Sequence, residues 1–190
     1  MKVNKLISYL FENVDEAMRL VPPDGTHIEI NSSDTGANIN IVKDVPEARE
    51  VRKKRENYMS IGRTEVLGEE GKYVWEVQGV KADHGYGPML YDIAMEIIYL
   101  IGGAGLMPDR DTVSPAARAV WAKYYTREDI NKKPLPENWF EDEEIFLRNR
   151  PNSLRYYYSK RGAPLLKDLK AKGLVQSGRF DLIDIMSYIK

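Results

Sequence analysis

Residues 74–90 read VWEVQGVKADHGYGPML, a strand-like run that leads through two glycines into an apolar helix. Trp75 and Val77 alternate with Glu76 and Gln78, which predicts a β-strand over about residues 72–82. Gly85 and Gly87 stand at the junction, where free backbone N–H groups and the positive end of a helix point at one spot. This arrangement predicts a phosphate-binding cradle. The alternative is a tight turn in which glycine only permits positive φ.

The segments on both sides of this junction extend the pattern. Apolar residues at helical spacing predict a helix over 87–101, and the short segment GLM (105–107) separates it from a second helix that begins after Ser114. Ser114 suits the N-cap position and Pro115 the first helical position. The resulting order is strand, helix, strand, helix.

Upstream of the junction, the sequence predicts mostly antiparallel strands. Alternating isoleucines on either side of a polar SSDTGA turn predict a hairpin near residues 27–41, and a strand at about 60–67 pairs with the strand at 72–82. Apolar residues at helical spacing over 6–18 predict an N-terminal amphipathic helix that ends at Pro22.

Composition restricts the classes of function. The 190 residues include 28 basic and 29 acidic ones, so no overall field draws the protein to nucleic acid or to an anionic membrane. The chain has no cysteine and two histidines, which argues against a disulfide, a thiolate nucleophile and a metal centre. No apolar run is long enough to span a bilayer, and no signal-peptide pattern is present. We therefore expect a soluble, cytoplasmic protein with no membrane partner.

The region from about residue 60 to 125 resembles the acetyl-CoA-binding half of the GNAT superfamily of acyltransferases. In that family a strand ends in Arg/Gln-x-x-Gly-x-Gly/Ala, and a helix, a strand and an Asn-x-x-Ala helix follow. The sequence Gly85-Tyr86-Gly87 matches the two glycines, and Ser114-x-x-Ala117 falls where the family often has Asn-x-x-Ala. Ala82 departs from the family's Arg or Gln, and Trp121 replaces a frequent general-acid tyrosine. The segment is also similar to uncharacterised GNAT-like proteins of bacteriophages.

The resemblance implies an α/β fold, a GNAT-like twisted mixed sheet flanked by helices, with a helical C-terminal extension. It implies an acyl-CoA-binding domain over residues 1–130 and an extension over 131–190 that packs on the same domain. The implied activity is transfer of an acetyl group from acetyl-CoA to an amine by direct attack. The expected cofactor-binding residues are Val80, Gly85, Tyr86, Gly87, Met89 and Leu90.

The expected catalytic residues follow from the same resemblance. Glu76 or His84 would remove a proton from the amine, and Tyr124 or Tyr125 would protonate the leaving thiolate. Each has a plainer interpretation: Glu76 as a solvated strand residue, His84 as a loop residue without a role, and the two tyrosines as core aromatics.

Two other functions stay open. Ala82 and Trp121 favour a non-catalytic GNAT-like protein, such as a virion component or a protein that binds a host protein. A GNAT-like phage enzyme that modifies DNA bases keeps the chemistry but changes the acceptor, and the near-neutral charge argues against it. The expected partners are accordingly an amine-bearing small molecule or protein, a phage or host protein, or a second copy of the chain, in the host cytoplasm or in a virion.

The remaining segments indicate packing more than chemistry. The basic strip at 49–55 is interleaved with glutamates and indicates a solvated face. Asp109-Arg110-Asp111 predicts a loop ion pair, with a substrate-carboxylate role for Arg110 as the alternative. Tyr156, Tyr157 and Tyr158 predict an added strand, with base stacking as the alternative. Residues 165–169 and 180–189 predict two short helices that cover the core or dock a partner.

Overall fold

The structure is a computed structural model that describes residue 22 and residues 25–43, 57–83, 86–109, 113–136, 151–178 and 183–190. Several expectations from the sequence lie outside these residues. They are the N-terminal helix at 6–18, the charged strip at 49–55, His84, Gly85, Arg110, Asp111 and Phe180.

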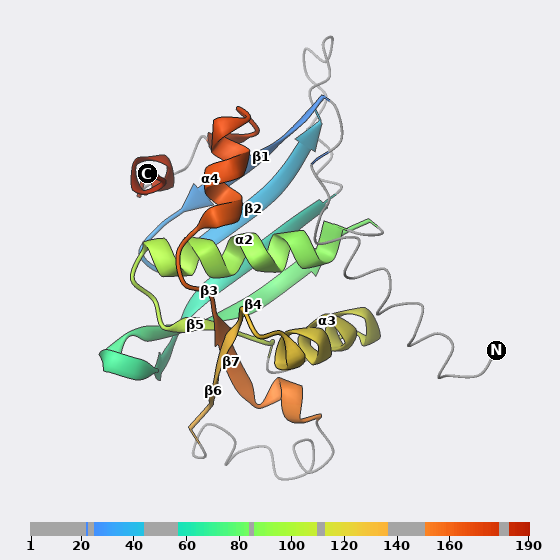
Figure 1. Cartoon of the computed structure of the whole chain (residues 1–190), viewed down its shortest axis with the longest axis vertical. Coiled ribbons are helices and arrows are strands. Elements are labelled where there is room, and N and C mark those ends of the chain that lie inside the picture. The colour runs from blue at the N-terminus through green and yellow to red at the C-terminus, as the bar shows by residue number, and fades with distance from the viewer. Residues whose placement is uncertain are drawn as a thin grey trace, which may run out of the picture.

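The described strands form one mixed sheet of eight strands in the order β6-β7-β5-β4-β3-β2-β1-β8 (Figure 1). Strands β1 to β4 form an antiparallel meander, which confirms the predicted hairpin and the predicted pairing of the next two strands. Two pairs are parallel, β4 with β5 and β1 with β8. The strands are β1 (Thr26–Ser32), β2 (Gly36–Lys43), β3 (Asn57–Leu67), β4 (Tyr73–Lys81), β5 (Gly105–Met107), β6 (Asn131–Pro134), β7 (Tyr156–Ser159) and β8 (Val175–Ser177).

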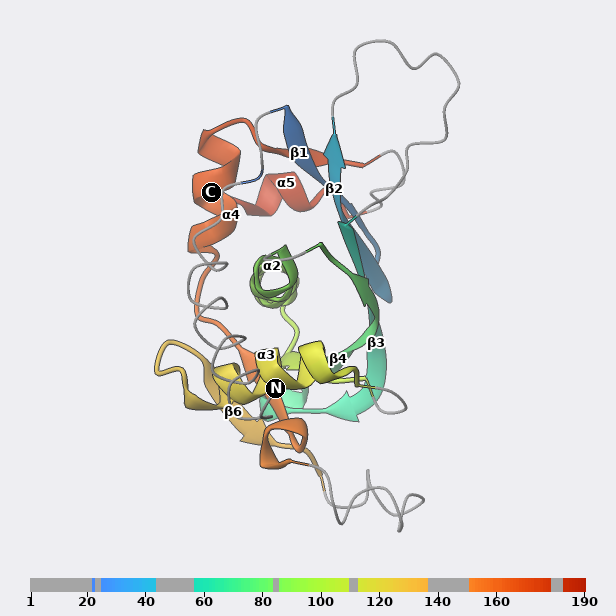
Figure 2. The same cartoon turned by 90° about the vertical axis from the view of Figure 1, so that its right-hand side faces the viewer.

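Helices pack over one face of the sheet. Figure 2 shows α2, α4 and α5 on the same side of strands β1–β3. The inward-facing isoleucines of β1 and β2 alternate with polar neighbours, so they form the floor on which the helices rest. The described helices are α2 (Tyr86–Leu100), α3 (Pro115–Thr126), α4 (Pro164–Ala171) and α5 (Ile185–Tyr188), with 3₁₀ turns η1 (Glu69–Gly71) and η4 (Asn152–Leu154).

Helix α2 is the central element of the core. The sequence predicts one apolar stripe along this helix, but every residue from Pro88 to Ile98 is buried. The sheet contacts one side of α2, and α3, α4 and α5 contact its other sides. A helix that neighbours surround in this way must be apolar nearly all round, or must pair each polar side chain.

A smaller apolar cluster lies on the other face of β4. Trp75 belongs to the main core, whereas its neighbour Val74 packs with Val66, Met107, Leu135 and Tyr157 in the second cluster. Successive residues of a strand point to opposite faces, so β4 and β5 are buried on both sides. They form the middle of the folded unit.

The C-terminal part of the chain differs from the helical extension that the sequence suggested. Besides α4 and α5, residues 131–178 contribute β6 and β7 to one edge of the sheet and β8 to the other. The predicted added strand is confirmed as β7. Tyr157 and Tyr158 are buried, and Tyr156 packs on Tyr125 with 5.3 Å between ring centroids, so the base-stacking interpretation of these tyrosines is wrong.

Candidate functional site

The parallel strands β4 and β5 separate at their carboxyl ends. They pair from Val74–Gly105 to Glu76–Met107, and β4 then continues to Lys81 while β5 ends. Along that stretch β4 still pairs with β3, but no strand in the described part of the chain pairs with its other edge. This open edge, residues 77–81, presents backbone N–H and C=O groups that lack a neighbouring strand.

A β-bulge coincides with the separation. Ser60 pairs with Gly79 and the next residue, Ile61, pairs with Val77, so Gln78 is an extra residue on β4. An extra residue bends its strand and increases the local twist. The bend begins two residues beyond the last pair with β5, which gives a physical reason for the divergence of the two strands.

A cavity of about 230 Å³ lies at this opening. Three elements supply most of its wall: the open edge of β4, the middle of α2 and the first two turns of α3. The lining residues are Val77, Gln78, Gly79, Val80, Tyr91, Asp109, Val113, Ser114, Ala117 and Trp121. The carboxyl ends of parallel strands are a common place for ligand binding in α/β folds, so this cavity is the candidate functional site.

Tyr91 is the most deeply placed polar residue of the cavity. Its side chain is 2% exposed and packs edge-on against Trp121 with 5.1 Å between ring centroids. We find no hydrogen bond of its hydroxyl group within the described part of the chain. Burial, and secondly the negative charge of Asp109, raise the pKa of Tyr91 above its ordinary value. The hydroxyl group therefore keeps its proton at neutral pH and is a permanent hydrogen-bond donor.

The start of α3 forms another part of the wall. Ser114 Oγ accepts a hydrogen bond from Ala117 N at 3.2 Å, and Ser114 O accepts one from Arg118 N at 2.9 Å. These bonds confirm the predicted N-cap, with Pro115 in the first turn. Because Pro115 has no N–H group and two other amides are already bonded, the helix start has little capacity left for an anion.

At two glycines beside the opening, neither the backbone conformation nor the surrounding atoms require glycine. A Cβ atom built on Gly79 or Gly87 meets no other heavy atom within 4 Å, and neither residue has a positive φ. By contrast, the other described glycines with such open space, for example Gly25 and Gly71, all have positive φ. Glycine at positions 79 and 87 therefore fits a backbone that something outside the chain approaches closely.

The structure brings some of the sequence-predicted residues to this cavity and not others. Val80 lines it, and Tyr86 and Gly87 begin α2 at the carboxyl end of β4. Met89 and Leu90 are buried in the core and do not line the cavity. Glu76 is half-buried on β4 but does not line the cavity. His84 and Gly85 lie outside the described residues.

Neither predicted proton donor lines the cavity. Tyr124 is fully buried, and its hydroxyl group donates a hydrogen bond to the carbonyl oxygen of Pro88 at 3.0 Å. Burial, and secondly the charge of Asp92, raise the pKa of Tyr124 well above its ordinary value, which makes it a weaker acid. Tyr125 packs against Tyr156 and beneath the ammonium group of Lys132.

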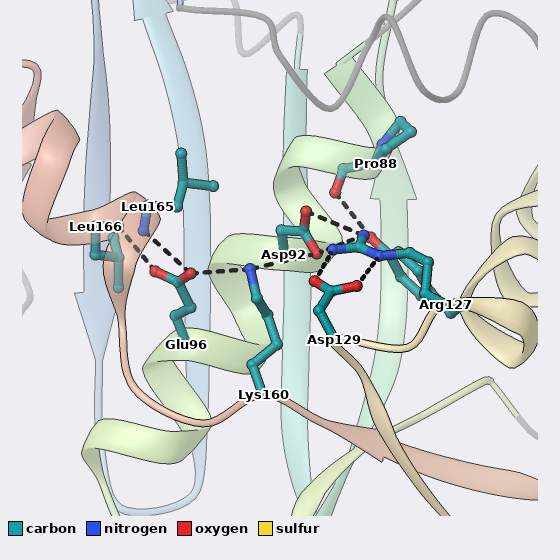
Figure 3. Close-up of polar contacts among 9 residues, drawn as sticks. Pro88, Asp92, Glu96, Arg127, Asp129, Lys160, Leu165 and Leu166 are labelled. Atoms are coloured by element: carbon teal, nitrogen blue, oxygen red, sulfur yellow. Dashed lines mark hydrogen bonds and ion pairs between the residues drawn. The ribbon is translucent and has the colours of Figure 1, made fainter.

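A buried charged network lies on the other side of α2 (Figure 3). Glu96 has no exposed surface; its Oε1 accepts a hydrogen bond from Lys160 Nζ at 3.0 Å. The same carboxylate accepts the backbone N–H groups of Leu165 and Leu166 at 3.2 and 2.8 Å. Those two amides belong to the first turn of α4, so a side chain of α2 caps α4 and holds it in place.

The network continues to the loop after α3. Arg127 Nη1 lies 3.2 Å from Asp92 Oδ1, and Arg127 Nη2 lies 2.5 Å from Asp129 Oδ2. Burial opposes the charge of Arg127, but the hydrogen bond to Asp129 and the charge of Asp92 together raise its pKa above its ordinary value. Since every member is paired, the network joins α2, the segment between α3 and β6, and α4 into one unit.

The sequence analysis missed Tyr91 and the buried acids, and it treated Asp109 only as part of a loop. Asp92 and Glu96 stand one turn apart in a helix whose other inner positions are apolar, which is a readable signal for buried, paired carboxylates. Tyr91 and Asp109 carry no such signal. Their common position depends on the parallel pairing of β4 with β5.

No protein-family model matches the chain, and no curated protein matches its sequence. No helix in the described ranges combines the length and the apolar character that crossing a bilayer requires.

Proposed function

We propose that this protein binds an acyl-CoA along the open edge of β4 and transfers the acyl group to an amine. The observation that carries the proposal is the separation of β4 from β5 next to a cavity of about 230 Å³. An extended arm with amide groups can add to an unpaired strand edge by main-chain hydrogen bonds, as a further strand would. The two amides of a pantetheine arm suit that edge.

Gly79 and Gly87 support the proposal from both ends of the opening. Gly79 lies on the open edge, and Gly87 lies in the first turn of α2, where the phosphates of CoA would meet the positive end of a helix. The space over both residues is open. Side chains larger than hydrogen would occupy the volume that the ligand needs.

We assign the role of hydrogen-bond donor to the reacting thioester to Tyr91, and not to Tyr124. The thioester of the co-substrate supplies a carbonyl carbon that is open to attack. As the amine attacks, negative charge develops on the carbonyl oxygen and then on the sulfur, and a buried hydroxyl donor stabilises such charge. Tyr91 meets this requirement because it lines the cavity and keeps its proton. Tyr124 does not meet it, since Pro88 already accepts its hydrogen bond.

The test is calorimetric titration of the full chain with CoA and with acetyl-CoA. Gly87→Val should weaken binding about tenfold or more while the melting temperature stays close to wild type, because a Cβ atom at position 87 meets no other described heavy atom within 4 Å. Ala171→Val, at an exposed position of α4, is the matched control for a β-branched side chain in a helix and should bind normally.

Two outcomes would count against the proposal. Unchanged CoA affinity in folded Gly87→Val removes the site assignment. Absence of millimolar CoA binding to the wild-type protein removes the function itself and leaves the non-catalytic, partner-binding hypothesis.

A further inference from the structure

A pair of side chains joins the end of β4 to the start of β3. Asn57, the first residue of β3, is buried, and Asp83 follows the end of β4 by two residues. Asn57 Oδ1 accepts a hydrogen bond from the backbone N–H group of Asp83 at 2.5 Å, and Asn57 Nδ2 donates one to Asp83 Oδ2 at 3.2 Å. One side-chain amide makes both bonds because it carries an acceptor and a donor side by side. We call this pair the Asn57–Asp83 clamp.

The clamp extends the hydrogen-bonded ladder between β3 and β4. Tyr58 pairs with Lys81 at this end of the ladder. One step further, the side-chain amide of Asn57 binds Asp83 as a backbone peptide group of the next rung would. Asp83 in turn leads into α2, since its carbonyl oxygen accepts a hydrogen bond from Tyr86 N at 3.1 Å. The clamp therefore fixes the path of the chain between β4 and α2.

The clamp also decides on which side of β4 the carboxylate of Asp83 lies. In the sheet order β5-β4-β3, β3 lies along one edge of β4, and the open edge 77–81 is the other edge. Because Asn57 belongs to β3, its Nδ2 atom holds the carboxylate on the β3 side. The proposed phosphate position, at Gly87 in the first turn of α2, lies at the same end of β4. Asp83 is exposed, so without Asn57 its carboxylate could turn toward a bound phosphate and repel it.

We infer that Asn57 is a positioning residue for acyl-CoA: it turns the carboxylate of Asp83 away from the phosphates, and the start of α2 stays attractive to an anion. The inference rests on the proposed function. Asn57 is 7% exposed and does not line the cavity, so it acts through Asp83 and not by contact with the ligand. The opposite signs of the two effects are the signature of this role. Loss of Asn57 weakens binding, and loss of the Asp83 charge then restores it.

The test is calorimetric titration of the full chain with CoA. Asn57→Ala should weaken binding about tenfold, because the carboxylate is released beside the phosphates. Asp83→Asn should bind CoA as well as wild type or better, since its side-chain oxygen still accepts the bond from Asn57 and the charge is gone. The double variant Asn57→Ala with Asp83→Asn should recover most of the lost affinity. Asn38→Ala, at an exposed asparagine of β2, is the matched control and should change nothing.

Ionic strength gives a second measurement. Salt screens the repulsion between exposed charges, so the affinity ratio of wild type to Asn57→Ala should shrink between about 0.05 and 0.5 M NaCl. A purely structural role of Asn57 predicts a constant ratio.

A second variant covers the case in which thermal unfolding shows that Asn57→Ala does not fold. Asn57→Asp keeps the shape of the side chain and the acceptor for Asp83 N, but it replaces the donor with a second carboxylate. CoA binding should weaken again. The exchange of the two side chains, Asn57→Asp with Asp83→Asn, should restore binding, because donor and acceptor then match and the negative charge stays on the β3 side.

The outcomes separate this inference from the proposed function. If the wild-type protein does not bind CoA, both fall together. If CoA binds and Gly87→Val weakens it, the acyl-CoA site stands whatever Asn57 does. Wild-type affinity in the Asn57 variant, a loss that Asp83→Asn does not recover, or a loss of equal size at both salt concentrations would then show that the inference about Asn57 is wrong.

Discussion

The hydroxyl group of Tyr124 on α3 donates a hydrogen bond to the carbonyl oxygen of Pro88 in the first turn of α2, across 3.0 Å. Tyr124 is fully buried, so this bond ties the start of α2 to the second half of α3 inside the core. Those two helices also form walls of the candidate site. Tyr124, which the sequence suggested as a general acid, therefore contributes to the site by holding α2 and α3 together.

Replacing Tyr124 with phenylalanine should lower stability by about 1–3 kcal/mol, because the Pro88 carbonyl loses a buried donor. Thermal unfolding measures this loss. Transfer by the folded variant, at saturating acetyl-CoA, should stay within a few fold of wild type. A much slower transfer with unchanged stability would restore Tyr124 as the proton donor.

Replacing Tyr91 with phenylalanine should leave the stability of the fold nearly unchanged and slow the transfer reaction. The variant removes a donor that has no hydrogen-bond partner in the described part of the chain, so stability should hold or rise slightly. The turnover number should fall about 100-fold to 1,000-fold if the hydroxyl group stabilises the developing charge. Tyr125→Phe, a tyrosine of the same helix pair outside the cavity, is the kinetic control. Equal turnover in both variants would exclude a role for Tyr91.

Replacing Glu96 with glutamine should destabilise the fold strongly, by about 3–5 kcal/mol, because the mostly buried Lys160 would lose its nearer carboxylate at 3.0 Å and keep only Asp92 at 3.8 Å. Chemical denaturation measures the change in free energy of unfolding. The double variant Glu96→Gln with Lys160→Met should recover part of the loss. The exposed pair Lys172–Asp168 on α4 is the matched contrast, and Asp168→Asn should cost about 0.5 kcal/mol or less. Equal effects at the two pairs would contradict the burial argument.

Deleting residues 175–190 should destabilise the protein instead of releasing a partner surface. The deletion removes β8, which pairs with β1, and the buried side chains of Ile185 and Ile189. It also removes the carbonyl groups of Met186 and Ile189 that accept hydrogen bonds from Lys170 Nζ. Each buried side chain contributes about 1.5–3 kcal/mol. Thermal unfolding with light scattering tests this: an unchanged melting temperature together with lost self-association would favour the partner-surface hypothesis.

The stabilising effect of Asp129 should depend on pH in the acid range. The hydrogen bond from Arg127 holds the pKa of Asp129 below its ordinary value of 3.8. A carboxylate whose pKa is lower in the folded state stabilises the fold above the unfolded-state pKa, and the effect is lost as pH falls through the folded-state pKa. The difference in melting temperature between wild type and Asp129→Asn should therefore be present near pH 6 and shrink below about pH 4. A constant difference over that range would contradict the pairing.

The sequence by itself determined the elements whose cause is local. The hairpin of β1 and β2, the pairing of β3 with β4, the extent of α2, and the Ser114 cap of α3 follow from alternation, helical spacing and turn chemistry, each within a few residues. The structure bears out all four. The added strand β7 and the C-terminal helices follow from the same rules.

Only the tertiary structure decided which residues meet. The bulge at Gln78 and the early end of β5 create the cavity, and no local pattern fixes where two parallel strands part. Tyr91 and Asp109 border the same cavity because a strand, a helix and a strand return the chain to the same edge. Lys160 reaches Glu96 across 64 residues of sequence for a similar reason. Such contacts between residues far apart in the sequence depend on how the whole core packs, and no short segment of the sequence predicts them.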